Sequence, residues 1–128
     1  MNIGILKENV RNERRIALTP AAAQSLIQSG HAVYVEKDAG SASHFPDGEF
    51  ASVGASVVYS SDEVFGRSDM LLKISSPTES DCERLLQSQI LFSFLHPAIA
   101  KTKTITALLR KDISVITRYS SGRTCGMR

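Results

Sequence analysis

The sequence predicts an α/β fold in which helices cover both faces of an open, doubly wound parallel sheet. Two observations carry this prediction. Short β-rich runs alternate with helical segments along the chain, which is the pattern of parallel strands joined by helical crossovers. The run from Ile90 to Leu95 is almost entirely apolar, as expected of a strand buried on both faces. A chain of 128 residues without internal repeats fits one such domain.

The first predicted helix has the clearest boundaries. Thr19 can cap it, Pro20 suits its first position, Ala21 to Ile27 continue it and Gly30 ends it. The other predicted elements of this half are a strand from Asn2 to Leu6, a strand from His31 to Glu36, a loop from Asp38 to Ser43, a helix from Asp47 to Val53 and a strand from Ala55 to Tyr59.

The second half continues the same alternation. Its predicted elements are a short capped helix from Ser61 to Val64, a strand from Met70 to Lys73, a helix from Glu79 to Gln87, the strand from Ile90 to Leu95, a helix from Ala98 to Lys111 and a strand from Ile113 to Thr117. The predicted domain therefore spans residues 1–117, and residues 118–128 form a divergent tail without a predicted element.

The composition excludes several classes of function. A net charge of +2 is too small to indicate nucleic acid or a membrane surface as a partner. No apolar run approaches the roughly 20 residues of a membrane span. Cys82 and Cys125 lack metal-ligand spacing, which favours reduced thiols. We therefore expect a cytoplasmic protein without a metal site.

Four basic residues are predicted at the edge of the sheet where ligands bind. In an open parallel sheet, this edge is formed by the carboxyl ends of the strands. Arg14 and Arg15 follow the first strand, Lys73 ends the fourth and His96 follows the fifth. An arginine can bind a carboxylate through two hydrogen bonds, a lysine can polarise a keto oxygen, and a histidine can transfer a proton. Together they suit a small anionic carbonyl compound, although each one alone also fits a solvated or structural role.

Several familiar motifs are missing from the sequence. It contains no G-x-x-x-x-G-K-[ST] phosphate loop and no G-x-S-x-G nucleophile elbow. The segment from Asp38 to Ser43 has one glycine, where the dinucleotide fingerprint G-x-G-x-x-G needs three. We therefore expect a Rossmann-like (flavodoxin-like) domain that lacks a dinucleotide fingerprint and binds no cofactor tightly.

A set of short motifs resembles the N-terminal domain of a known enzyme family. These motifs are Gly4-Ile-Leu-Lys-Glu8, Asn12-Glu13, Arg15-Ile-Ala-Leu-Thr-Pro20, Gly30-His31, Asp38-Ala-Gly40, Ala51 to Ala55, Leu71-Leu-Lys73 and Leu91-Phe-Ser-Phe-Leu-His96. In their order and spacing, over residues 2 to 117, they resemble the alanine dehydrogenases and the α subunits of proton-translocating nicotinamide nucleotide transhydrogenases. Leu6 and Ile16 are mild departures, because proline and valine are usual at these positions.

The resemblance implies roles for three of the basic residues. In the alanine dehydrogenases, the arginine matching Arg15 binds the substrate carboxylate, the lysine matching Lys73 contacts the substrate oxygens, and the histidine matching His96 transfers a proton. The transhydrogenases lack this histidine, which favours the dehydrogenases, whereas Pro97-Ala98 is more typical of the transhydrogenases. Family enzymes also contain a separate dinucleotide-binding domain, which this sequence lacks.

The resemblance therefore implies the substrate-binding domain of an NAD(H)-dependent amino-acid dehydrogenase that interconverts L-alanine and pyruvate, present as a truncated chain or fragment. NAD would serve the complete enzyme, while the isolated chain is expected to bind a 2-oxo acid weakly without turnover. Uncovered apolar surface favours a homo-oligomer. The alternatives are a non-enzymatic ligand-binding module, or the substrate domain of a saccharopine- or opine-type dehydrogenase or of a transhydrogenase α subunit.

Overall fold

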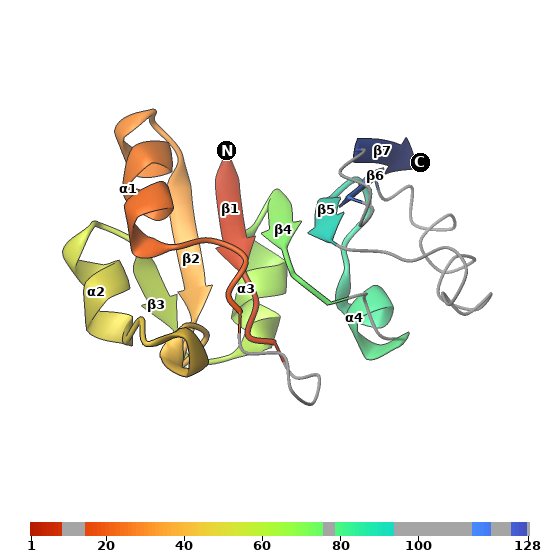
Figure 1. The fold of residues 1–128 in the computed structure, drawn as a ribbon. Coiled ribbons are helices and arrows are strands. Elements are labelled where there is room, and N and C mark those ends of the chain that lie inside the picture. The colour runs from red at the N-terminus through yellow and green to blue at the C-terminus, as the bar shows by residue number, and fades with distance from the viewer. Residues whose placement is uncertain (9–14, 76–78, 94–113, 119–123, 128) are drawn as a thin grey trace.

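The computed structural model describes residues 1–8, 15–75, 79–93, 114–118 and 124–127, which form an α/β domain (Figure 1). The strands are β1 (Asn2–Ile5), β2 (Ala32–Glu36), β3 (Ser56–Val58), β4 (Met70–Leu72), β5 (Ile90–Ser93), β6 (Ser114–Arg118) and β7 (Thr124–Met127). The α-helices are α1 (Pro20–Gln28), α2 (Asp47–Ser52), α3 (Ser61–Arg67) and α4 (Glu79–Arg84), and a 3-10 turn, η1, spans Ser41–Ser43.

The described strands form one sheet in the order β3-β2-β1-β4-β5-β6-β7. Strands β1 to β6 pair in parallel; Ile3, for example, lies between Val33 of β2 and Met70 of β4. The predicted doubly wound α/β fold is confirmed. The order of its first six strands is that of the Rossmann fold rather than that of flavodoxin, a distinction that the alternation of strands and helices does not make.

Strand β7 lies in the tail for which the sequence predicts no element. It runs antiparallel to β6, with Met127 opposite Val115 and Thr124 opposite Arg118. The run Thr124-Cys-Gly-Met127 is short and contains a glycine, which weakens a strand, so the local sequence gives little signal for one. The hydrogen-bonding edge of β6 provides the pairing instead, and this is a tertiary effect.

Helices cover both faces of the sheet, and each layer has its own core. Helices α1 and α2 pack on one face, where Phe50 and Ile5 are fully buried. Helices α3 and α4 pack on the other, where Val64, Leu71 and Cys82 are buried (Figure 1). Because side chains alternate along a strand, Leu71 faces α3 and α4 whereas Leu72 belongs to the α1 layer. The switch of faces at each residue determines the direction of Lys73, described below.

Gly4 allows β1 to approach α3 closely. A Cβ atom at this position would lie 2.7 Å from Cγ1 of Val64 and would also collide with the hydroxyl group of Ser68. Real Cβ atoms essentially never come so near a neighbour, so the glycine is required by packing rather than by a turn.

The boundaries of α1 agree with the sequence prediction. The Thr19 hydroxyl accepts a hydrogen bond from the Ala22 N–H at 3.2 Å, and Pro20 opens the helix. Gly30 follows the helix with φ of 97°, a conformation that favours glycine. Helix α3 is longer than predicted and ends at Arg67, while α4 is shorter and ends at Arg84. The predicted helix from Ala98 to Lys111 lies outside the described residues.

Candidate functional site

The strand order reverses between β1 and β4, and this is where an open α/β sheet binds its ligands. From β1 the chain continues outward to β2 and β3, then returns to β4 on the other side of β1. The crevice lies outside the carboxyl ends of these strands. Lys7 and Glu8 follow β1, and Lys73, Ile74 and Ser75 follow β4. We therefore take these two loops as the candidate site.

The Glu8 carboxylate connects the two loops. One of its oxygens accepts a hydrogen bond from the Ile74 N–H at 2.9 Å. The other accepts from the Ser75 N–H at 3.0 Å and from the Ser75 hydroxyl at 2.7 Å. The loop after β1 is also bound to β2, because the Lys7 N–H donates to the Glu36 carboxylate at 2.7 Å.

The Lys73 side chain is buried and paired with an acidic residue of α4. Its ammonium lies 2.5 Å from Oδ2 of Asp81, and the exposed fractions of the two side chains are 2% and 6%. Alternation along β4 explains the direction, because Leu72 faces α1 and the next residue must face α4. The positive charge is thus neutralised inside the domain, below the edge of the sheet.

Arg84 extends this pair into a network. Its guanidinium donates to the other oxygen of Asp81 at 3.1 Å and to the hydroxyl of Ser61, at the start of α3. It also lies over the ring of Phe65, with 4.8 Å between the guanidinium carbon and the ring centre. The network therefore fastens α4 to both β4 and α3.

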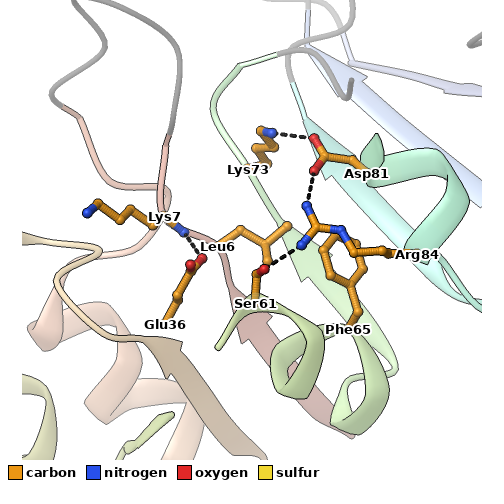
Figure 2. Close-up of a pocket in the computed structure, with 8 residues that line it drawn as sticks. All are labelled: Leu6, Lys7, Glu36, Ser61, Phe65, Lys73, Asp81 and Arg84. Carbon is orange, nitrogen blue, oxygen red and sulfur yellow. Dashed lines mark hydrogen bonds and ion pairs between the residues drawn. The ribbon is translucent and has the colours of Figure 1, made fainter. Parts of the chain in front are cut away.

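A small cavity of about 80 Å³ lies beside this network (Figure 2). Figure 2 shows Lys73 and Arg84 pointing toward the two oxygens of Asp81, with Glu36 and Lys7 on the opposite side. The described residues that line the cavity are Leu6, Lys7, Glu36, Ser61, Phe65, Lys73, Asp81 and Arg84. Buried Lys73 and partly exposed Arg84 already share the Asp81 carboxylate, so the arrangement suits a structural charge network better than an open anion site.

A second hollow, of about 650 Å³, is mostly apolar and lies on the α1 side of the sheet beside β4 and β5. Its lining includes Leu18, Leu26, Met70, Leu72 and Phe92. Met70, Leu72 and Phe92 are only half-buried, while their neighbours on the opposite face of the same strands are buried. The described helices therefore cover one face of β4 and β5 more fully than the other.

The structure describes two of the three predicted site residues, Arg15 and Lys73. Arg15 is exposed in the loop between β1 and α1, where the next residues, Ile16 and Leu18, pack against the core. Lys73 is buried against Asp81. Arg15 is not among the described residues that line the cavity at Lys73. His96 and Arg14 lie outside the described residues.

Sequence reasoning missed Asp81, Arg84 and Glu8 as members of this region. A signal for Asp81 existed, since a lysine buried at a strand end needs an anion and the next helix is rich in acidic residues. The spacing of Asp81 and Arg84, three residues apart in a helix, also favours a pair. The sequence contains no comparable signal for Glu8, because its partners are backbone amides of a distant loop.

The described residues do not fit a dinucleotide. In a Rossmann domain, the loop after the first strand approaches the pyrophosphate through glycines. Here that loop begins with Lys7 and Glu8, and the Glu8 side chain crosses to the β4 loop. Among the described residues there is also no group of three or more side chains that could hold a metal ion. None of the helices described is long and apolar enough to cross a membrane.

Comparisons with known proteins identify a family with similar sequences. The family model for "Alanine dehydrogenase/PNT, N-terminal domain" matches residues 4–118. An alanine dehydrogenase of Methanococcus maripaludis is 40% identical over 116 residues, covering 91% of this chain and 31% of that protein.

Solved structures show the same fold. An L-alanine dehydrogenase has a TM-score of 0.87 and 29% sequence identity, covering 96% of this chain and 35% of that chain. A transhydrogenase from Sinorhizobium meliloti has a TM-score of 0.83 at 24% identity, covering 91% of this chain and 34% of that chain, which is a likeness of fold alone. The chain thus spans about a third of the length of the relatives it matches.

Proposed function

Since the chain belongs to the family of alanine dehydrogenase and PNT N-terminal domains, we propose that it is the substrate-binding domain of an NAD(H)-dependent amino-acid dehydrogenase. The reaction would interconvert L-alanine and pyruvate. The curated relatives that support this choice, at 36% to 40% identity, are alanine dehydrogenases. The observation that carries the proposal is the position of Arg15, exposed in the loop that leaves β1 at the point where the strand order reverses.

Arg15 is proposed to bind the carboxylate of the oxo acid. A guanidinium can form two parallel hydrogen bonds with a carboxylate, which fixes its orientation as well as its position. His96 is proposed to transfer a proton, on the strength of the family resemblance. NAD would supply hydride chemistry from a separate domain, since the described residues of this chain do not fit it.

The proposed contact of Lys73 with substrate oxygens has less support. Its side chain is 2% exposed, and its ammonium would have to leave Asp81 to reach a ligand at the edge of the sheet. We therefore propose a structural role for Lys73 in this chain: the buried cation holds α4 beneath the β4 loop. The difference is testable, because a structural cation can be replaced together with its partner while binding is retained.

Titration with pyruvate tests the proposed function directly. We expect saturable binding in the millimolar range by calorimetry, because one arginine clamp on a small ligand corresponds to roughly 4 kcal/mol. Larger 2-oxo acids, such as 2-oxoglutarate, are expected to bind more weakly, which would distinguish this domain from an opine-type one. The absence of binding for all oxo acids would contradict the proposal and favour a module of another kind.

We further propose that the chain associates with itself through the apolar hollow beside β4 and β5, and that it is cytoplasmic. Half-buried Met70, Leu72 and Phe92 support the association, because apolar surface of this kind favours contact with another protein surface. Cys82 is buried and forms no disulfide bond, which is consistent with a reducing compartment.

Light scattering tests the association. We expect the mass of an oligomer at about 100 µM, and a return to monomer for Met70→Lys, because the charge would be desolvated in the contact. Leu86→Lys is the matched control, since Leu86 is an exposed apolar residue that does not line the hollow. A clean monomer for the unmodified chain would contradict the proposal.

A further inference from the structure

Glu8 occupies a small anion-binding arrangement on the β4 loop. The N–H groups of Ile74 and Ser75, which are consecutive, both point at its carboxylate, at 2.9 and 3.0 Å. The Ser75 hydroxyl adds a third donor at 2.7 Å. Successive backbone N–H groups that converge in this way form a nest, which favours a negative charge. Both oxygens of one carboxylate are used, so a glutamate fills the nest completely.

The nest lies just beyond the last backbone hydrogen bond between β1 and β4. The backbone ladder between β1 and β4 extends to the Leu6 N–H, which donates to the Leu72 carbonyl at 3.3 Å. Beyond that point the segments that follow β1 and β4 lead to opposite layers, since α1 and α4 cover different faces of the sheet. The Glu8 side chain continues the connection where the backbone ladder ends.

The β4 loop is consequently fixed from two directions. Lys73 binds Asp81 of α4, and the next two residues bind Glu8 of the β1 loop. The β1 loop is itself held at Lys7, whose N–H donates to Glu36 of β2. Charge-assisted hydrogen bonds of this kind are about twice as strong as neutral ones.

We infer that Glu8 is a positioning residue: its carboxylate fills an amide nest on the β4 loop and so fixes the spacing between that loop and Lys7-Glu8, where the loop that leads to Arg15 begins. The significance for oxo-acid binding rests on the proposed function. The nest itself does not depend on the proposed function. It is specific for a carboxylate, because its three donors match the two oxygens of that group.

Amide hydrogen exchange tests the nest without a ligand. In Glu8→Gln, exchange at Ile74 and Ser75 should rise about fivefold, since one charged acceptor is lost. Glu49→Gln is the matched control, because Glu49 is an exposed glutamate on α2, and it should leave both amides unchanged. In Glu8→Ala, sodium formate should restore protection at Ile74 and Ser75, while sodium chloride at equal ionic strength should not. Unchanged exchange in Glu8→Gln, or equal rescue by chloride, would overturn the inference.

Pyruvate titration then tests the positioning role. Glu8→Gln should weaken binding about fivefold, while the midpoint of urea unfolding changes no more than it does in Glu49→Gln. If exchange rises in Glu8→Gln but the dissociation constant does not change, the positioning role is wrong. If the unmodified chain binds no oxo acid, the proposed function fails. In that case the fixed spacing stands only if exchange at Lys7 also rises in Glu8→Gln, and it is overturned if Lys7 is unaffected.

Discussion

Replacing Asp81 with leucine is expected to lower the free energy of unfolding by about 3–5 kcal/mol, because it leaves the ammonium of Lys73 buried without its anion. In the described part of the chain, Asp81 is the carboxylate that pairs with Lys73, and the two side chains are 6% and 2% exposed. A buried ion cannot recover its hydration in place, so the loss appears as reduced stability. Urea denaturation of the single variant measures it.

A double variant separates the buried charge from the lost packing. Lys73→Met combined with Asp81→Leu removes both charges and should recover most of the stability, since apolar replacement of a buried pair is often neutral or stabilising. Glu63→Gln is the surface control. Its pair with Arg67 is half-exposed, so a change of at most about 1 kcal/mol is expected. An Asp81→Leu variant as stable as this control would contradict the buried pair.

The same double variant decides the role of Lys73. If Lys73 is structural, a folded protein without it should bind pyruvate with nearly the same dissociation constant as the unmodified chain. If Lys73 contacts the oxo acid, the double variant should be stable but lose binding. This comparison is informative because stability and binding are measured on a protein without the buried ammonium and its carboxylate, while Arg84, which is 30% exposed, keeps its ion pair with Asp62.

Arg15→Ala is expected to weaken pyruvate binding by about 10- to 100-fold, which corresponds to the loss of charged hydrogen bonds to a carboxylate. The dissociation constant of Arg15→Lys should fall between those of the unmodified chain and Arg15→Ala, because lysine keeps the charge but loses the planar pair of donors. Arg67→Ala removes another exposed arginine, on α3, and should leave the dissociation constant unchanged. Calorimetry measures all three, and equal binding by Arg15→Ala would show that the carboxylate is held elsewhere.

Local sequence patterns predict the elements of this fold well where the signal is local. Thr19 and Pro20 mark the start of α1 because capping depends on residues that are neighbours in the chain. The order of the strands is different. It depends on pairings such as Ile3 with Met70, far apart in sequence, and on which face each crossover takes. Strand β7, like the strand order, depends on tertiary pairing, since the edge of β6 provides its hydrogen bonds.

The candidate site is predicted in part. The position of a residue after a strand places it at the carboxyl edge of the sheet, as it does for Lys73 after β4 and for the loop that leads from β1 to Arg15. It does not indicate which way the side chain turns. Alternation from Leu72 gives that direction for Lys73 and leads to Asp81, a partner that becomes recognisable only when α4 is known to lie on the same face. His96 lies outside the described residues, and its role stays a prediction.

The burial of Cys82 makes the rate of thiol labelling a measure of how often α4 moves away from the sheet. The thiol lies in α4 beside Asp81 and is 1% exposed within the α3 and α4 layer. A thiol reagent can reach it only when α4 moves away from the sheet, so the rate of labelling counts these openings. With Cys125 replaced by serine, that rate reports how often the helix beneath the β4 loop detaches, in a protein that is otherwise folded.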